Sequence, residues 1–352
     1  MGVPTKRIDV GILGATGTVG QELIAQLTSH PWFNLTWLAG SHRSEGKRYA
    51  AVTHWRLATP RPNGIGEMMV HSSTPVGAPT LVFSGLDAKV AGEIEGSFAT
   101  AGHTIISNAK NYRMELDVPL LIPEINSEHL QLLEAQTARR GWAGRIVTNP
   151  NCSTIPLSMA LAPLQSFGLK TVNVSTLQAI SGAGYPGVAS LDIVGNVIPF
   201  IDGEEEKIQA ETQKILGVLK NGAVRPHPVI ISAHCTRVPV VNGHSLLISV
   251  GFSSQPTIDD LLEAFRAFSA KAPTRQLPSA PQHPVIYLDE PDRPQPRLDV
   301  DRDGGMAVTI GRLRPCPVLD YKFVALSHNT IRGAAGAALL NAELMKVNGL
   351  FD

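Results

Sequence analysis

The sequence predicts an α/β protein: a doubly wound parallel sheet comes first, then an α+β domain with a mixed or antiparallel sheet. Up to about residue 150, short β-rich runs alternate with helical patterns, which is typical of a parallel sheet covered on both faces. Beyond Asn151 the runs are longer and several alternate in polarity, as antiparallel strands do when one face meets water. The third observation is a glycine-rich turn where the first strand would become a helix.

The elements of the first half are expected in a regular order. We predict strands at residues 8–13, 35–40, 79–86 and 103–109, and helices at residues 18–30 and 127–141. The first helix would stop at Pro31 and the second at Gly141, since proline and glycine commonly end helices.

The second half has longer runs that predict strands, within residues 171–181, 234–252 and 306–315. A proline-rich loop region is expected at 277–299, and a helix rich in small residues at 330–347 would return to the first domain. We therefore predict two domains, one formed by residues 1–150 with 329–352 and the other by residues 151–328.

One stretch of the second half imitates a calcium loop. Asp299, Asp301, Asp303 and Gly304 have the required spacing, but Ile310 holds the twelfth position, where a bidentate Glu belongs. We expect a hairpin turn there and no metal site.

Composition excludes several classes of protein. The 352 residues include 30 acidic and 30 basic side chains, so no overall field favours nucleic acid or a membrane surface. No apolar segment approaches the ~20 residues needed to span a bilayer. The cysteines Cys152, Cys235 and Cys316 are widely spaced and form no CxxC pair, which favours free thiols in a reducing, cytoplasmic compartment.

The turn after the first strand predicts a phosphate site. Gly14 and Gly17, with Thr16 and Thr18, stand where the strand becomes a helix. A pyrophosphate needs backbone N–H groups and a helix N-terminus close by, and larger side chains would obstruct both. We therefore predict a Rossmann-type dinucleotide-binding domain.

The end of the second strand indicates which dinucleotide binds. An NAD site usually has Asp or Glu there for the ribose hydroxyls. This chain has Ser41, Arg43 and Ser44, and Glu45 comes one residue late. A guanidinium beside two hydroxyls suits a 2′-phosphate, so NADP is expected.

Cys152 is the candidate nucleophile. It lies between the run that ends in TNPN and an amphipathic helix predicted at 153–164, with Pro156 in its first turn. A helix N-terminus favours the thiolate. A buried structural cysteine is the alternative, and it is the interpretation we keep for Cys235 and Cys316. Cys152 differs because polar residues surround it in the chain.

A cysteine nucleophile commonly has a histidine partner that is distant in sequence. Of eleven histidines, His244 follows an Asn-Gly turn and precedes a strand, a placement that can aim an imidazole into a site. By itself this placement only suggests a role for His244.

Seven motifs span residues 11 to 336: GATGTVGQ, SNAKNYR before DVPLLIPEIN, TNPNCST, QAISGAG, EEEK, CTRVPVVNGH and HNTIRGAAG. In this order they resemble the aspartate-β-semialdehyde dehydrogenases, most of all their archaeal and fungal branch. The resemblance implies that Cys152 is the nucleophile, that His244 is the general acid/base and that Gln178 orients the acyl intermediate. It implies that Arg237 clamps the substrate α-carboxylate and that Glu204 meets the amino group. The phosphate or substrate would also contact Lys207, Arg113 and Asn108. The resemblance also implies that Val19, Ser84, Ser181, Gly182 and Asn329 lie against the cofactor.

The expected reaction is the NADP-dependent reduction of β-aspartyl phosphate to aspartate semialdehyde through a cysteine thioester, in threonine and methionine biosynthesis. The family also implies a homodimer or homotetramer. Small zwitterionic substrates suit a site with cations, one anion and a thiol, and a bidentate Arg is the natural grip for a carboxylate. Without the family pattern, Arg113 and Lys207 would be taken as surface charges and Gln178 as solvent-facing.

Other activities share parts of this pattern. Short-chain epimerases need a Tyr-xxx-Lys pair, and none of the five tyrosines has Lys four residues later. N-acetyl-glutamyl-phosphate reductases typically have Tyr after the cysteine, where this chain has Ser153. Malonyl-CoA reductases share nearly all the motifs and remain an open alternative. A non-catalytic NADP-binding sensor should have lost Cys152 or His244, and both are present.

Overall fold

The computed structural model describes residues 7–351, so the predicted ends of the first domain, residues 1–6 and 352, lie outside it. The chain forms two compact units. Unit 1 comprises the chain up to Leu121 with Glu128–Asn149 and the chain from Ala338, and unit 2 comprises Ile122–Ser127 and Pro150–Ala337. Residues 122–127 and 329–337 thus belong to unit 2, whereas the predicted division had them in the first domain. The two segments are joined by a hydrogen-bonded ion pair, in which the Arg332 guanidinium donates to both carboxylate oxygens of Glu124.

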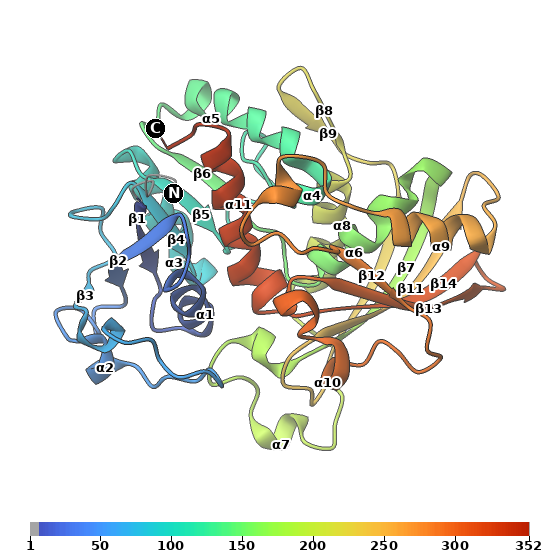
Figure 1. Ribbon diagram of the computed structural model, residues 1–352, viewed down its shortest axis with the longest axis horizontal. Coiled ribbons are helices and arrows are strands. Elements are labelled where there is room, and N and C mark those ends of the chain that lie inside the picture. Colours follow the sequence, from blue (N-terminus) through green and yellow to red (C-terminus); the bar gives the residue numbers. More distant parts are fainter. Residues whose placement is uncertain (1–6, 352) are drawn as a thin grey trace, which may run out of the picture. The chain divides into compact units, whose positions relative to one another are not determined.

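Unit 1 is built on a parallel six-stranded sheet (Figure 1). Its order is β3 (Val70–His71), β2 (Phe33–Ala39), β1 (Ile8–Leu13), β4 (Leu81–Ser84), β5 (Thr104–Ser107) and β6 (Arg145–Thr148). This is the strand order of dinucleotide-binding folds, in which ligands bind at the carboxyl ends of the strands. The predicted α/β class and the four predicted strands are confirmed.

Unit 1 contains the helices predicted in its sequence and three further ones, α2, η1 and α3. They are α1 (Thr18–Leu27), α2 (Tyr49–Val52), η1 (Ile65–Glu67), α3 (Ala88–Thr100), α5 (Leu132–Arg140), and most of η2 (Ser127–Gln131) and of α11 (Gly336–Val347). The helix predicted at 127–141 is divided into a 3₁₀ turn and α5, which ends at Gly141 with a φ of 63°. Phe98 of α3 packs with Leu13, Val82 and Ile105 of the sheet in a fully buried cluster.

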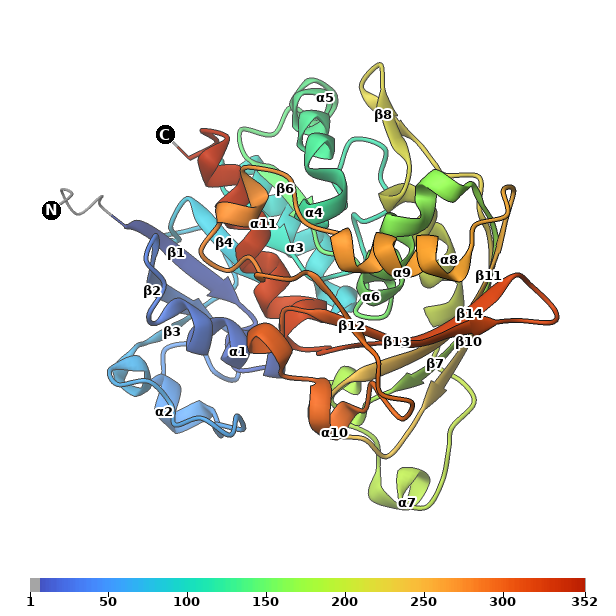
Figure 2. The same cartoon turned by 45° about the vertical axis from the view of Figure 1, so that its right-hand side comes forward.

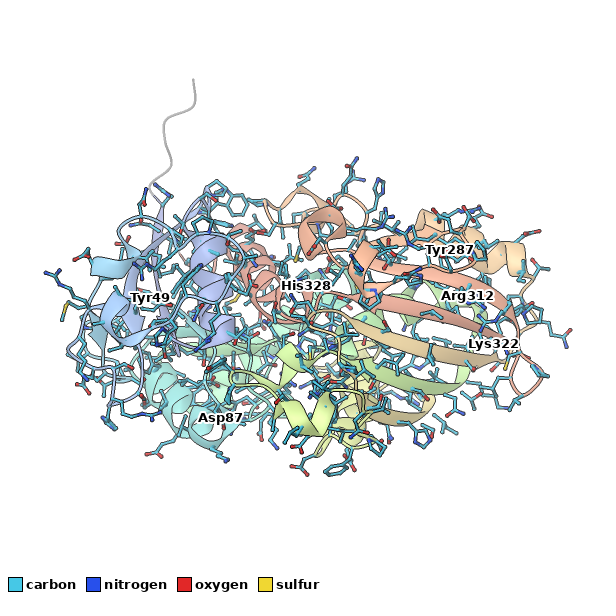
Figure 3. The ribbon with its side chains drawn as sticks, turned by 90° about the horizontal axis from the view of Figure 1, so that it is seen from below. Tyr49, Asp87, Tyr287, Arg312, Lys322 and His328 are labelled. Carbon is cyan, nitrogen blue, oxygen red and sulfur yellow. The ribbon has the colours of Figure 1, made fainter. Side chains whose placement is uncertain are left out.

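Unit 2 is built on a mixed six-stranded sheet (Figure 2). Its order is β10 (Ile230–Arg237), β7 (Leu169–Gln178), β11 (His244–Phe252), β14 (Tyr321–Ser327), β13 (Val308–Pro315) and β12 (Val285–Leu288). The β10–β7 and β12–β13 pairs are parallel, and the other pairs are antiparallel. Tyr287, Arg312 and Lys322, labelled in Figure 3, belong to β12, β13 and β14 respectively.

Helices α6 (Thr154–Leu161), α8 (Glu204–Ile215) and α9 (Ile258–Ala267) lie along one side of this sheet (Figure 2), where they contact β14, β10 and β12 respectively. The remaining elements of unit 2 are α4 (Pro123–Asn126), η3 (Ala162–Phe167), η4 (Ile180–Ala183), α7 (Ser190–Ile193), the β8 (Val218–Lys220) and β9 (Ala223–Arg225) hairpin, η5 (Thr274–Gln276), α10 (Pro296–Asp299), η6 (Arg302–Gly305) and the π-helical turn η7 (Ile331–Ala335).

Three local predictions are wrong. The proline-rich region 277–299 was predicted as a loop but contains β12 and α10. The strand was missed because four residues flanked by prolines leave little periodic signal. The stretch 299–310 is no hairpin turn, since it helps connect the parallel strands β12 and β13. The helix after Cys152 is not amphipathic: every residue of α6 is buried, since it packs against α8, β13 and β14.

The Asp residue that opens the calcium-like stretch is engaged by arginines. Asp299 is buried and accepts from Arg293 Nε at 2.7 Å and from Arg302 Nε at 2.8 Å. In the described chain, the His, Cys, Asp and Glu side chains form no group suited to a metal ion. Within residues 7–351, no helix has both the length and the apolar character that crossing a membrane requires.

Candidate active site

The turn between β1 and α1 has the features of a phosphate cradle. Gly14 has a φ of +74°, and a Cβ there would lie 2.7 Å from the Gly85 carbonyl oxygen. Gly17 is the N-cap of α1 and, among the described residues, no side chain caps this helix start. A Cβ on Gly20 would lie 2.7 Å from Ala15 Cα, so glycine permits α1 to pack closely on the turn. Thr16 lies in this turn, and Thr18 and Val19 open the helix, so the backbone amides are available to an anion.

The turn after β2 carries the residues predicted to recognise the 2′-phosphate. Ser41 and Arg43 are exposed, and Ser44 is buried, with its N–H donating to the Ser41 carbonyl at 2.8 Å. Lys47 Nζ donates to the Arg43 carbonyl at 2.9 Å. Glu45 lies 3.5 Å from His42 in the same turn. Hydroxyl and basic groups therefore gather at the strand end where this fold binds the ribose.

A row of side-chain amides joins strand ends of unit 1. Asn108 Nδ2 donates to the Ser84 carbonyl at 2.9 Å, and Asn149 Nδ2 donates to Asn108 Oδ1 at 2.8 Å. Asn341 of α11 donates in turn to Asn149 Oδ1 at 2.6 Å. Arg113 is buried, not a surface charge, and its Nη2 donates to the Asn108 carbonyl at 2.7 Å.

Glu95 of α3 lies beside these strand ends and was not predicted. It is fully buried, and its Oε1 accepts from the Ser107 hydroxyl at 2.8 Å. Burial raises the pKa of Glu95 to about 7, although the Ser84 and Ser107 hydroxyls and Arg113 lower it. The signal that could have found it is weak, because one Glu on a helix reads as a solvated charge.

Unit 2 brings together the predicted nucleophile and its predicted partner. Cys152 Sγ lies 3.2 Å from His244 Nε2. Cys152 is partly exposed and precedes α6, and His244 is the first residue of β11 and is fully buried. The Asn151 side chain caps α6, since its Oδ1 accepts from the N–H groups of Ser153 and Thr154 at 2.8 and 3.3 Å.

Two carboxylates of α8 hold the residue before the cysteine. Glu204 Oε1 accepts from Asn151 Nδ2 at 2.8 Å, and Glu211 Oε2 accepts from the Asn151 backbone N–H at 2.6 Å. Both glutamates are buried. Sequence reasoning missed Asn151 and Glu211 as site residues, because their contacts join chain segments 53 and 60 residues apart.

Glu204 is also paired with Lys207. The Lys207 Nζ lies 2.9 Å from Glu204 Oε2. Burial opposes ionisation of Glu204, but the Lys207 ammonium and the Asn151 amide together hold its pKa below the usual carboxyl value. The residues predicted to meet the substrate amino group and the phosphate therefore form an ion pair with each other.

Ala179, just after β7, contacts two of the predicted site residues through its backbone. Its N–H donates to His244 Nδ1 at 3.0 Å, and its carbonyl accepts from Arg237 Nη1 at 2.8 Å. Burial, and then the Arg237 guanidinium, lowers the pKa of His244 to about 3, while Glu204 and the Gly243 carbonyl act in the opposite direction. The imidazole is therefore neutral at physiological pH.

Gln178 and Arg237 end neighbouring strands and lie opposite each other in the β7–β10 register. Both are buried, so Gln178 is not solvent-facing. Gln178 Nε2 donates to the Thr176 hydroxyl at 3.2 Å.

Asn329 connects the approach to His244 with the turn after Ala179. Its Oδ1 accepts from the Gly243 N–H at 2.8 Å, and its Nδ2 donates to the Ser181 hydroxyl at 2.7 Å. The predicted cofactor residues Ser181 and Asn329 therefore contact each other.

Two glycines leave room for the reactive side chains. A Cβ on Gly182 would lie 2.9 Å from Arg237 Nη1 and 3.1 Å from His244 Nε2. A Cβ on Gly333 would lie 2.7 Å from Cys152 Cβ. Gly182 was predicted at the cofactor, whereas Gly333 was missed although it stands in the HNTIRGAAG motif.

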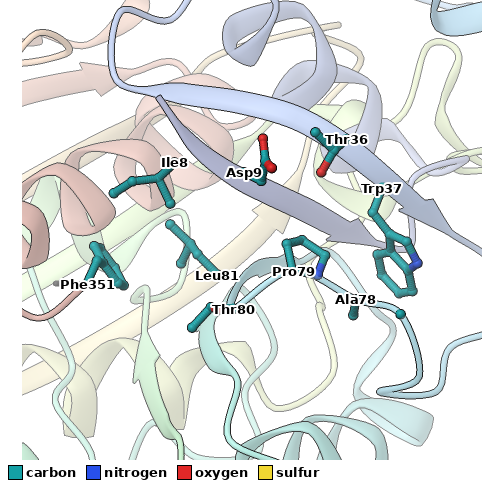
Figure 4. A pocket seen from close by; sticks show the side chains of 10 residues that line it. Ile8, Asp9, Thr36, Trp37, Ala78, Pro79, Thr80, Leu81 and Phe351 are labelled. Carbon is teal, nitrogen blue, oxygen red and sulfur yellow. The ribbon is translucent and has the colours of Figure 1, made fainter. Parts of the chain in front are cut away.

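A separate cavity of about 550 Å³ lies in unit 1 at the starts of β1 and β4 (Figure 4). Ile8, Asp9, Trp37 and Leu81 are among its lining residues. It holds none of the predicted site residues, and in a parallel sheet this edge is opposite to the phosphate turn.

Comparison with known proteins places these features in a family. The chain matches the model "Semialdehyde dehydrogenase, NAD binding domain" over residues 9–133 and "Semialdehyde dehydrogenase, dimerisation domain" over residues 161–332. The aspartate-semialdehyde dehydrogenase of Methanothermobacter thermautotrophicus is 50% identical over 343 residues, which cover 96% of this chain and 99% of the relative. That of Cryptococcus neoformans is 48% identical over 364 residues, covering 99% and 100%.

Solved structures similar to this chain come from the same family. A crystal structure of aspartate-semialdehyde dehydrogenase with NADP from Candida albicans has a TM-score of 0.90 at 43% identity and covers 97% of this chain and 99% of its own. A structure of aspartate-semialdehyde dehydrogenase II complexed with ASA from Vibrio cholerae has a TM-score of 0.76 at 25% identity, over 98% and 99%.

The parallel sheet with its glycine turn and the mixed sheet that carries the cysteine–histidine pair define the class: an oxidoreductase of the semialdehyde dehydrogenase type. Within that class, relatives that are 42–50% identical over nearly the whole chain specify the branch. The chain belongs to the aspartate-semialdehyde dehydrogenase family, and the predicted resemblance is confirmed.

Proposed function

We propose that this protein catalyses the NADP-dependent interconversion of β-aspartyl phosphate and aspartate semialdehyde through a thioester on Cys152. In biosynthesis it runs toward the semialdehyde, which supplies the aspartate family of amino acids. The observation that carries the proposal is the 3.2 Å approach of Cys152 Sγ to His244 Nε2 beside the buried Arg237. A nucleophilic cysteine with an oriented histidine is the arrangement that acyl transfer requires.

The steps are written in the oxidative direction. The Cys152 thiolate attacks the aldehyde carbon, a C–S bond forms, and the oxygen takes the negative charge. Loss of the hydride from this carbon leaves a thioester on Cys152, and NADP⁺ held by unit 1 would supply the hydride acceptor. A phosphate oxygen then attacks the thioester carbon, the C–S bond breaks, and the thiolate is restored. Covalent catalysis suits this reaction because a thioester conserves the acyl energy that hydrolysis would dissipate.

Substrate recognition is assigned to the charged groups of unit 2. Arg237 would hold the α-carboxylate, since a guanidinium can grip a carboxylate with two parallel hydrogen bonds. Glu204 would bind the amino group. The substrate ammonium would then replace Lys207 as the partner of Glu204, and Lys207 would be free to bind phosphate. The family pattern also assigns Arg113 and Asn108 to phosphate or substrate, and Gln178 is proposed to orient the acyl group.

The phosphates of the cofactor are assigned to unit 1. Its residues fit a dinucleotide, because Gly14 and Gly17 leave space where a Cβ would intrude and the start of α1 has amides to offer. Thr16, Thr18 and Val19 would line the pyrophosphate, and Ser41, Arg43 and Ser44 would bind the 2′-phosphate. Ser84, Ser181, Gly182 and Asn329 are proposed to approach the nicotinamide end.

The assembly and location follow from the family and the cysteines. We propose a homodimer or homotetramer formed through unit 2, since residues 161–332 match a dimerisation domain. Cys152, Cys235 and Cys316 are all free thiols, which fits the reducing cytoplasm.

The test is a paired assay. The purified protein should form NADPH from aspartate semialdehyde only when phosphate or arsenate is present. The same preparation should not oxidise NADPH with malonyl-CoA. Turnover of malonyl-CoA without turnover of the semialdehyde would transfer the assignment to malonyl-CoA reductase, and inactivity with both would favour a binding protein.

A further inference from the structure

Two buried side chains that have no role in the proposed function bind the glycine turn between β1 and α1. Tyr49, labelled in Figure 3, is fully buried, and its hydroxyl donates to the Ala15 carbonyl at 2.9 Å. Gln21 is also buried, and its Nε2 donates to the Thr16 carbonyl at 3.3 Å. Two consecutive carbonyls of the turn therefore each accept a hydrogen bond from a buried side chain.

The direction of these carbonyls decides what the turn can offer to an anion. In a planar trans peptide the carbonyl oxygen and the next N–H point to opposite sides. The bond from Tyr49 to the Ala15 carbonyl therefore turns the Thr16 N–H away from Tyr49. The Gly17 N–H donates to the Gly14 carbonyl at 3.0 Å, which closes the turn. If a peptide of the turn rotated, a carbonyl oxygen would face the bound anion in place of an N–H donor, and the anion would be repelled.

Both contacts join the glycine turn to the segment that follows the predicted 2′-phosphate turn. Tyr49 itself is the first residue of α2 in this segment. The Gln21 side chain accepts from the Arg56 N–H at 2.8 Å and donates to the His54 carbonyl at 3.1 Å. The segment that begins at Tyr49 therefore holds the peptides of the glycine turn in one orientation.

We propose that Tyr49 and Gln21 are positioning residues for the cofactor: they hold the carbonyls of the glycine turn away from the pyrophosphate and leave the Thr16 N–H to bind it. This inference rests on the proposed assignment of the dinucleotide to this turn. Tyr49 suits the role because burial raises its pKa above the usual value, so the hydroxyl keeps its proton and remains a donor.

The proposal gives these residues a different signature from Arg43. NADPH and NADH share the pyrophosphate, so a disordered turn should weaken the binding of both by the same factor. Adenosine 2′-monophosphate has no pyrophosphate, so its binding should depend on Arg43 and not on Tyr49. A variant that merely destabilised unit 1 would weaken the binding of all three ligands.

Equilibrium binding to the full chain measures this signature. NADPH and NADH are titrated by their fluorescence, and adenosine 2′-monophosphate is titrated by displacement of NADPH. Tyr49→Phe removes only the hydroxyl, and we expect the Kd of NADPH and of NADH each to rise about 3- to 10-fold, as loss of one hydrogen bond predicts. The Kd of adenosine 2′-monophosphate should stay within about twofold, and in turnover the KM for NADP should rise with kcat unchanged.

Tyr321→Phe is the matched control. The Tyr321 hydroxyl also donates to a backbone carbonyl, that of Pro256 at 2.7 Å, but it lies in unit 2. This variant should bind all three ligands as the wild type does. Gln21→Met tests the second contact, because it removes the donors to Thr16 and His54, and it should weaken NADPH binding at least as much as Tyr49→Phe.

An unchanged Kd of NADPH in Tyr49→Phe would overturn the proposal. Equal weakening of adenosine 2′-monophosphate and NADPH would also overturn it, because Tyr49 would then support unit 1 as a whole. If Gln21→Met fails to fold, Tyr49→Phe decides the question, since Phe keeps the buried ring. The binding measurements need no turnover, so a wild-type protein that binds NADPH and fails to oxidise the semialdehyde would refute the proposed function alone.

Discussion

The sulfur of Cys152 lies 3.2 Å from Nε2 of His244, although 92 residues separate them in the chain. Cys152 precedes a helix and His244 begins a strand, so each is placed by the end of a regular element. The contact is supported on both sides. Asn151 is tied to α8 next to the sulfur, and Ala179 fixes the imidazole. The site is therefore held mainly by backbone groups and buried carboxylates.

Removing the sulfur should abolish activity without unfolding the protein. Cys152→Ala is expected to lose NADPH formation entirely, because no thioester can form. The side chain is partly exposed, so thermal unfolding should change little. Cys316→Ala is the matched control, since this thiol is also partly exposed, and it should retain wild-type turnover. Residual phosphate-dependent turnover in Cys152→Ala would refute the thioester.

Adding one methyl group beside the nucleophile should impair catalysis. In Gly333→Ala the new Cβ would lie 2.7 Å from Cys152 Cβ, so the cysteine must move. A displacement near 1 Å at a reacting atom can cost about 10²-fold in kcat. Gly77→Ala, at a turn with a φ of +74° and open space around it, controls for the loss of a glycine. Steady-state kinetics should show a normal kcat for Gly77→Ala, and an unchanged kcat in Gly333→Ala would be a contrary result.

Glu211 is expected to act through Asn151. Glu211→Ala leaves the Asn151 N–H without this acceptor, which should cost about 1–3 kcal/mol of stability and lower kcat. Glu211→Gln keeps an amide oxygen at the same place and should restore most of both. Urea unfolding with kinetics at saturating substrate distinguishes the cases. If both variants lose kcat equally, the charge of Glu211 matters more than its hydrogen bond.

The pKa of Glu95 predicts a pH-dependent stability. Below its ordinary value of 4.5 the group is protonated in both states, and between 4.5 and about 7 only the folded state keeps the proton. The unfolded state then binds fewer protons, so stability falls as the pH rises through this window. Glu95→Gln removes the penalty and keeps an oxygen for the Ser107 hydroxyl. Its free energy of unfolding relative to wild type should rise by up to about 3 kcal/mol between pH 4.5 and 8.5, and a flat difference would contradict the buried-acid interpretation.

The sequence predicted the parts of the site that local patterns encode. The glycines of the Gly14–Gly20 turn have a short, regular spacing. The reactive groups of Cys152 and His244 are their side chains, which the sequence names directly. Ala179 was not predicted, because its contribution comes from its N–H and carbonyl, and an alanine carries no chemical signal. Gly333 and Glu211 were missed because their importance lies in contacts across the fold. The strand β12 was missed because it has four residues and lies between prolines.

Arg43 should decide between the two nicotinamide dinucleotides. Arg43 is exposed in the turn after β2, and Ser41 and Ser44 provide hydroxyls in the same turn. The Lys47 ammonium donates to the backbone carbonyl of Arg43. In Arg43→Ala the KM for NADP should rise about 10- to 100-fold, since a charge-assisted contact to phosphate contributes about 1.5–3 kcal/mol. The KM for NAD should stay within about twofold, because NAD lacks the 2′-phosphate that the guanidinium would bind. Lys89→Ala, at the start of α3, is the control for loss of a positive charge from unit 1 and should leave both KM values unchanged.

Because the 2′-phosphate contact is electrostatic, the wild-type KM for NADP should also rise with salt, and Arg43→Ala should show a weaker salt dependence. Equal increases in the KM for NADP and NAD would mean that Arg43 stabilises the turn and does not select the cofactor.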